Sequence, residues 1–90
     1  MRQTNRIFPP ALNASESLPG VPLIEIVGQG RVLIEYHLGV IMYSVEEICV
    51  KVKYGMICVC GCGLQLARMT KQQLVITGNI EDVKLLGGQR

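Results

Sequence analysis

The sequence predicts an all-β fold: a single small domain of about six or seven short, mostly antiparallel strands joined by glycine turns. Two observations predict this class. Three short runs rich in Ile, Val and Leu are each closed by a glycine, which can supply a positive φ at a strand end, at 24–28, 57–61 and 74–78. At 48–53 apolar and other residues alternate with the two-residue period of a strand. A curled sheet, a roll and a small barrel all satisfy this pattern.

Three strands are predicted in the first half of the domain, at 24–27, 31–36 and 40–43. Gly28-Gln29-Gly30 is expected to be the hairpin between the first two, because neither the helix nor the Lys-Ser/Thr pair of a phosphate loop follows it. Ser44-Val45-Glu46-Glu47 matches a helix capping box. No helical run follows that box, so we expect one turn there at most.

The next two strands form the clearest predicted hairpin. The runs at 48–53 and 56–60 flank Tyr54-Gly55, which is expected to be the turn. A two-residue loop at that place pairs Val52 with Ile57, Val50 with Val59, and Cys49 with Cys60. A slip of one residue would place lysines in the core, so the alternation favours this register.

Glycine also divides the rest of the domain. Gly61-Cys62-Gly63 predicts a turn into a run at 64–66, and Gly78-Asn79 predicts a second tight turn after the run at 74–77. Ile80 and Val83 are three residues apart, which breaks strict alternation. That spacing predicts a β-bulge at the two acidic residues between them.

Length and composition limit the domain organisation. A chain of 90 residues with 49% hydrophobic and 18% charged residues indicates one folded domain. Residues 1–20 hold three of the four prolines and are expected to be a flexible tail. The β domain is therefore assigned to 21–86, with a short C-terminal tail at 87–90. A net charge of +2 and only 4% aromatic residues exclude a dedicated nucleic-acid-binding domain.

No export signal is visible near the start of the chain, because residues 1–20 contain no sustained apolar run. The longest apolar run, at 56–60, is far shorter than the roughly 20 residues that span a bilayer. We therefore expect a cytoplasmic protein without a transmembrane segment of its own. Peripheral contact with a membrane is compatible with this composition.

No catalytic residue and no cofactor are predicted. One His, one Asp and six Glu offer little material for an active site, and no side chain stands in a recognisable nucleophile or acid-base setting. His37 lies in the predicted turn at 35–39. We expect it to be a hydrogen-bonding turn residue and not a catalytic group.

The cysteines are the most distinctive chemical feature. Candidate metal ligands for zinc or copper(I) are Cys49, Cys58, Cys60 and Cys62. Alternate residues on one strand stand about 6–7 Å apart, whereas structural zinc usually uses a tight CxxC turn, so no metal site is predicted. The predicted register would also allow a Cys49–Cys60 disulfide. In a reducing cytosol we expect small, buried or half-buried thiols instead.

Several sequence segments, taken together, resemble a known family. These are 18–28 (LPGVPLIEIVG), 32–41 (VLIEYHLGVI), Tyr43-Ser44 with Glu47-Ile48, Tyr54-Gly55, Gly61 with Leu64, Met69-Thr70, and 74–80 (LVITGNI) with Val83. In this order and spacing, over residues 18–86, the chain resembles the YabP/YqfC family of sporulation proteins. The cysteine-rich segment 58–62 departs from that pattern, which argues against a shared role for the thiols.

The resemblance implies a protein made in the mother cell of an endospore-forming bacterium and needed for normal spore development. It implies no catalytic activity and no cofactor, and it implies a membrane-protein companion at the forespore envelope. The matching glycines and aliphatic residues are expected to determine the fold.

Two hypotheses about function follow. In the first, the protein acts by binding partners, as a homo-oligomer or with an envelope protein, because apolar residues fall opposite the predicted core face. These residues are Leu33, Met42, Cys58, Cys60 and Val75. In the second, the four cysteines form a thiol-based metal-binding or redox module.

Overall fold

The computed structural model describes residues 21–87, which form six strands and contain no helix. The all-β prediction is confirmed. The predicted flexible tail at 1–20, and all but the first residue of the tail at 87–90, lie outside the described residues. The strands are β1 (Leu23–Val27), β2 (Arg31–Glu35), β3 (Val40–Tyr43), β4 (Glu47–Val52), β5 (Gly55–Met69) and β6 (Gln73–Gly87).

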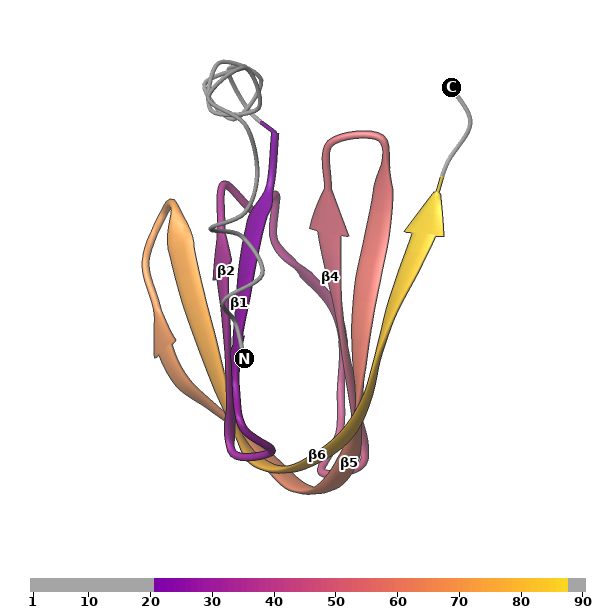
Figure 1. Cartoon of the computed structure of the whole chain (residues 1–90). Coiled ribbons are helices and arrows are strands. Elements are labelled where there is room, and N and C mark those ends of the chain that lie inside the picture. The colour runs from indigo at the N-terminus through magenta and orange to yellow at the C-terminus, as the bar shows by residue number, and fades with distance from the viewer. Residues whose placement is uncertain (1–20, 88–90) are drawn as a thin grey trace, which may run out of the picture.

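All six strands belong to one antiparallel sheet, in the order β1-β2-β6-β5-β4-β3. The two long strands β5 and β6 bend in the middle, so the sheet folds into a V with two arms (Figure 1). The first arm contains β1, β2, the part of β6 that begins at Gln73 and the part of β5 that ends at Met69. In the second arm, β3 and β4 extend the other halves of β5 and β6.

Glycine makes the bend possible. A side chain at Gly61 would collide with the carbonyl oxygen of Asn79, and a Cβ at Gly78, where φ is +135°, would lie 2.7 Å from the carbonyl oxygen of Gly63. The predicted turns at Gly61-Cys62-Gly63 and Gly78-Asn79 are therefore wrong. Both strands continue through these positions, because glycine lets the two backbones approach and bend while they remain paired.

The predicted β-bulge is confirmed beside the bend. Cys60 pairs with Asp82 while its neighbour Gly61 pairs with Ile80, so Glu81 is the extra residue on β6. The turns of the outer hairpins also meet the bend. The amide of Ile80 donates to the carbonyl oxygen of Gln29 at 2.7 Å, and the amide of Gly61 donates to that of Glu46 at 3.0 Å.

The register of the β4–β5 hairpin differs from the prediction by two residues. Cys49 lies opposite Cys58, and Val52 lies opposite Gly55. The turn consists of Lys53 and Tyr54 and not of Tyr54 and Gly55. Tyr54 itself adopts the positive φ, 71°, that was expected of the glycine. Gly55 is instead the first residue of β5, where a side chain would collide with the carbonyl oxygen of Leu86 on β6.

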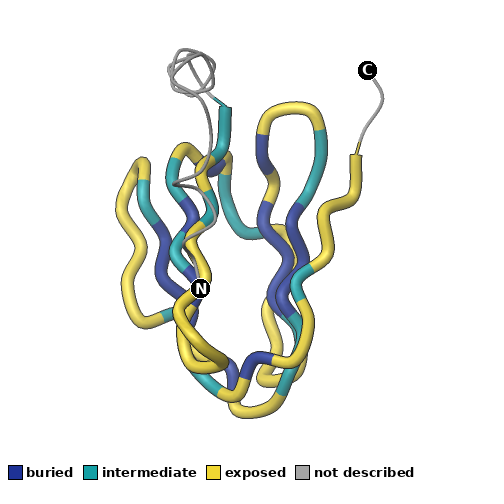
Figure 2. The backbone as a smooth tube through the Cα atoms, in the orientation of Figure 1, coloured by how far each residue is buried: buried dark blue, intermediate teal, exposed yellow. Residues whose placement is uncertain are grey.

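The core lies between the two arms, where the buried segments of both arms face each other (Figure 2). It contains Val32, Ile34, Leu64, Leu74 and Ile76 from the first arm, Ile48, Val50, Val52, Ile57 and Val59 from the second, and Ile80 beside the bend. These side chains alternate with outward-facing residues along β2 and β4, which is the two-residue period expected from the sequence.

Ser44-Val45-Glu46-Glu47 forms a hairpin turn between β3 and β4 and no helix, as predicted. The Ser44 hydroxyl accepts hydrogen bonds from the amides of Glu46 and Glu47, at 3.2 and 2.9 Å. A local side-chain acceptor of this kind stabilises a turn as readily as a helix start, which explains the resemblance to a capping box.

Candidate functional site

The candidate site lies on the outer face of the second arm. Along β4, Ile48 and Val50 point into the core, so Glu47 and Cys49 point outward. Along β5, Ile57 and Val59 are core residues, and Cys58 and Cys60 alternate with them. Two types of potential metal ligand, carboxylate and thiol, therefore share one face of two adjacent strands.

In the strand register these four residues form two directly opposite pairs, one beside the other. Glu47 lies opposite Cys60, and Cys49 lies opposite Cys58. We call these four residues the β4–β5 cluster. Cys49 and Cys58 are buried, with 5% and 3% of their surface exposed, while Glu47 and Cys60 are half-buried.

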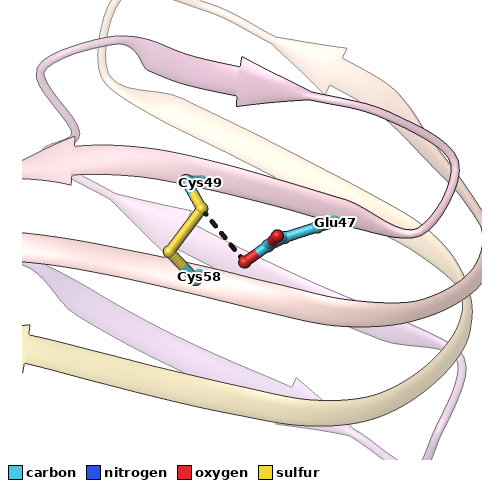
Figure 3. Close-up of side chains that lie close together, drawn as sticks. All are labelled: Glu47, Cys49 and Cys58. Carbon is cyan, nitrogen blue, oxygen red and sulfur yellow. Dashed lines mark hydrogen bonds between the residues drawn. A yellow bond between two sulfur atoms is a disulfide. The ribbon is translucent and has the colours of Figure 1, made fainter.

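Cys49 and Cys58 form a disulfide, with their Cα atoms 4.1 Å apart (Figure 3). The expectation that all four cysteines would be thiols is wrong for this pair in the structure. The short Cα distance is typical of a non-hydrogen-bonded pair in an antiparallel sheet, where side chains lie closest. The alternative Cys49–Cys60 bridge is excluded by the observed register, which places Cys60 opposite Glu47.

The Glu47 carboxylate lies between two sulfurs. Its Oε2 atom is 3.6 Å from Sγ of Cys49 and 3.9 Å from Sγ of Cys60. A disulfide-bonded Cys49 has no thiol hydrogen to donate, so the first contact is a hydrogen bond only when the disulfide is reduced. Partial burial, and then the negative charge of Glu47, raise the pKa of the Cys60 thiol above its ordinary value.

Cys62 does not join the cluster. It lies at the bend, is exposed, and its thiol donates to Oε2 of Glu81 at 3.6 Å. The charge and hydrogen bond of Glu81 raise the pKa of the Cys62 thiol. Of the four candidate ligands named from the sequence, the structure therefore brings together Cys49 and Cys58, and it links Cys60 to them through Glu47.

Glu47 is the residue that sequence reasoning missed. A usable signal was present, because Glu47 and Cys49 are two residues apart on a predicted strand and must share a face. The predicted strand at 48–53 begins one residue after Glu47, and the predicted register does not place Glu47 opposite Cys60.

His37 is a buried hydrogen-bonding residue, as predicted. Its Nδ1 accepts a hydrogen bond from the amide of Gly39 at 3.0 Å, so Nε2 carries the hydrogen and donates to the carbonyl oxygen of Thr70 at 2.9 Å. These bonds attach the segment between β2 and β3 to the β5–β6 turn. Both ring nitrogens are occupied by backbone groups, and the ring therefore has a structural role.

Exposed apolar side chains gather on the edge strands and at strand ends. Among the residues described, Ile41, Met42 and Tyr43 on β3 are all exposed, as are Leu85 and Leu86 near the end of β6. The outward-facing Leu33 and Val75, by contrast, pair with each other in the first arm, and Val75 is buried. Most of the exposed apolar surface is thus at edges and not on the outer faces.

Residues 21–87 include no helix with the length and hydropathy needed to cross a membrane. A shallow groove of about 460 Å³ at the tip of the second arm is lined partly by apolar residues. The lining consists of Ile41, Lys51, Tyr54, Gly55, Met56, Leu86 and Gly87. This groove joins the exposed apolar residues of β3 to those of β6.

Comparison with known proteins identifies a family. The family model described as the YabP family matches residues 21–90, which include every strand of the structure. No curated protein and no solved structure matches the chain. The match extends over most of the sequence and includes both arms, the bend and the β4–β5 cluster, and the chain therefore belongs to the YabP family.

Proposed function

We propose that this chain is a non-enzymatic sporulation protein of an endospore-forming bacterium, required for normal spore development. It acts by protein–protein interaction in the mother-cell cytoplasm, at the forespore envelope. Membership of the YabP family is consistent with a role in sporulation. Within that family, the segments at 18–28 and 32–41 resemble the sporulation protein YqfC.

The observation that supports a role in protein–protein interaction is the set of open strand edges. Among residues 21–87, β1 in the first arm and β3 in the second arm each have one neighbouring strand. β6 is paired with β2 from Gln73 to Thr77, and no other described strand lies along that side of its second half. Unpaired strand edges with exposed apolar side chains are surfaces on which other strands add.

The second half of β6 is the edge best suited to a second copy of the chain. Because Cys49 and Cys58 form a non-hydrogen-bonded pair, the backbone groups of Cys58 point toward Lys84 on β6. Alternation then directs the amide and carbonyl of Val83 toward the free edge. A two-fold antiparallel pair centred on Val83 would form hydrogen bonds between the two Val83 residues.

The same pairing is complementary in charge. Asp82 and Lys84 are exposed, share one face of β6 and flank Val83. In the two-fold pair, Asp82 of each copy lies opposite Lys84 of the other, which forms two ion pairs. Opposite charges directly across antiparallel strands stabilise a register, and like charges destabilise it.

A charge-swap series tests this homo-oligomer. We expect the unmodified protein to be dimeric by light scattering at tens of micromolar. Asp82→Lys and Lys84→Asp should each weaken the dimer at low salt by at least about tenfold, because each creates two like-charge pairs. The double variant restores opposite pairs and should restore the dimer.

A monomer at every concentration, or a double variant as weak as the single ones, would overturn the pairing at β6. The wider proposal has its own test. Crosslinking and pulldown of a tagged chain from sporulating cells should recover a membrane-associated sporulation protein. Recovery only of proteins that an unrelated tagged cytoplasmic control also captures would contradict it.

A thiol-based redox module, or a metal centre that uses all four cysteines, is not favoured as the function of this chain. Cys62 lies apart from the other three cysteines, and the pKa values of both free thiols are raised, which reduces their thiolate character. A reactive redox centre needs thiolates that are easily formed.

A further inference from the structure

We propose that the reduced form of the chain binds Zn²⁺ through Cys49, Cys58, Cys60 and Glu47, on the outer face of β4 and β5. The proposal is independent of the proposed function in sporulation, which requires no metal. It replaces the four-cysteine set considered from the sequence with three cysteines and one carboxylate. The metal would fasten the β4–β5 hairpin where the oxidised form has a disulfide.

Three of the four proposed ligand atoms already lie close together, and the fourth contacts one of them. One ligand atom from each of Glu47, Cys49 and Cys58 lies within 4.8 Å of the others. The fourth ligand, Sγ of Cys60, is 3.9 Å from Oε2 of Glu47, and Sγ of Cys49 is 3.6 Å from the same oxygen. Bond lengths of about 2.3 Å to sulfur and about 2.0–2.2 Å to oxygen require ligand atoms about 3.4–3.8 Å apart in a tetrahedral site. After reduction, side-chain rotations have to separate the sulfurs of Cys49 and Cys58 and bring Sγ of Cys60, which lies outside that group of three, toward them.

The backbone places these ligands before any metal binds. Two directly opposite pairs, Glu47 with Cys60 and Cys49 with Cys58, occupy adjacent positions on one face of a hairpin. The buried sulfurs of Cys49 and Cys58 are shielded from solvent, and the half-buried Glu47 and Cys60 form the open side. This arrangement provides both a preorganised site and an entry path for the ion.

The charge of the ligands favours binding of a cation, because the site consists of three thiolates and one carboxylate. These ligands carry four negative charges, which one Zn²⁺ neutralises in part. Lys51 lies two residues from Cys49 on the same face of β4, and Lys84 lies opposite Cys58 on β6. Lys51 and Lys84 therefore offset part of the remaining negative charge, while Asp82, opposite Cys60 on β6, adds to it.

The disulfide and the metal exclude each other, because both use the sulfurs of Cys49 and Cys58. A small-molecule dithiol or phosphine supplies the two electrons that break the S–S bond, and two protons complete two thiols. Zn²⁺ binding then releases the thiol protons of Cys49, Cys58 and Cys60 to solvent as the three metal–sulfur bonds form. Metal binding should therefore require reduction.

The experiment is a titration of the full chain, reduced with a phosphine, using Co²⁺ as a spectroscopic probe. We expect one equivalent of Co²⁺ to produce thiolate-to-cobalt charge-transfer bands and the intense visible bands of a tetrahedral site, and Zn²⁺ to displace it. The oxidised protein should show neither set of bands. Cys60→Ser and Glu47→Gln should each weaken binding by at least the roughly 10–100-fold that loss of an outer-shell partner costs.

Matched controls are available in the chain. Cys62→Ser removes a thiol outside the cluster, and Glu46→Gln removes an exposed carboxylate beside Glu47. Both should bind Co²⁺ as the unmodified chain does, and a thermal melt of each variant establishes that it is folded. Absence of tetrahedral bands in the reduced protein would overturn the proposal. It would also be overturned if Cys62→Ser abolished binding or if Cys60→Ser left it unchanged.

Discussion

Cys60 and Cys62 lie two residues apart on β5, yet different groups determine their acidity. For Cys60 burial is the largest cause of its raised pKa, and the carboxylate of Glu47 is the second. For exposed Cys62 the largest cause is the charge of Glu81, followed by the hydrogen bond to the same residue. The β-bulge creates this second environment, because Glu81 is the extra residue on β6 beside the bend.

The Cys62 environment gives a prediction for thiol reactivity. Glu81→Gln removes the negative charge that disfavours the thiolate, so the pKa of Cys62 should fall. Only the thiolate reacts with iodoacetamide, so alkylation of Cys62 at mildly alkaline pH should become faster, and its pH profile should shift to lower pH. Site-resolved mass spectrometry measures the rate at each cysteine.

Cys60 is the internal control for that experiment, because Glu81 is not among the groups that shift its pKa. Its alkylation profile should be the same in Glu81→Gln and in the unmodified chain. An unchanged rate at Cys62 would show that Glu81 does not control its acidity.

The bend in β5 and β6 is the structural element on which the fold depends. It converts two strands of 15 residues into four half-strands, one pair in each arm. The bend also receives the β1–β2 and β3–β4 turns through backbone hydrogen bonds from Ile80 and Gly61. Both arms are therefore connected at one place, where glycine lets the backbones meet.

Gly78 provides the clearest test of this element. Gly78→Ala places a Cβ 2.7 Å from the carbonyl oxygen of Gly63. The backbone there has a φ of +135°, which residues other than glycine rarely adopt. The variant should lose more than about 2 kcal/mol of unfolding free energy, measured by urea denaturation. Gly30→Ala is the matched control, because nothing lies within 4 Å of its Cβ position. That substitution should change stability by less than about 0.5 kcal/mol.

The whole molecule is stabilised by one core shared between two arms. Within the described residues neither arm has a second layer of its own, so each covers the apolar inner face of the other (Figure 2). A domain of this size buries only about 60% of the surface of its unfolded chain. The two arms should consequently unfold together.

Two conservative core substitutions test this cooperativity. Ile76→Val in the first arm and Ile48→Val in the second remove one methylene group from fully buried positions. Each should cost about 0.5–1.5 kcal/mol and should accelerate amide hydrogen exchange in both arms alike. Ile26→Val, at a position 51% exposed, should have little effect. Faster exchange confined to the substituted arm would show that the arms are separate folding units.

Local patterns in the sequence were enough to predict the fold class. Alternation identified the strand at 48–53 and its core residues, the glycine-bounded runs identified strands without helices, and the spacing of Ile80 and Val83 identified the bulge. These features depend on neighbouring residues, which is why they could be predicted. The four cysteines were likewise recognised as the main chemical candidates.

The remaining features depend on contacts between distant segments. Whether Gly61 and Gly78 end a strand or bend it depends on the opposite backbone, which continues the pairing on both sides. Tyr54 with its positive φ, and not Gly55, forms the β4–β5 turn, because Gly55 is needed where Leu86 approaches. That change of two residues in register places Cys58 opposite Cys49 and Glu47 opposite Cys60. Spacing along the chain thus identified the strands and the thiols, while pairing across the sheet selected which thiols meet and added the carboxylate.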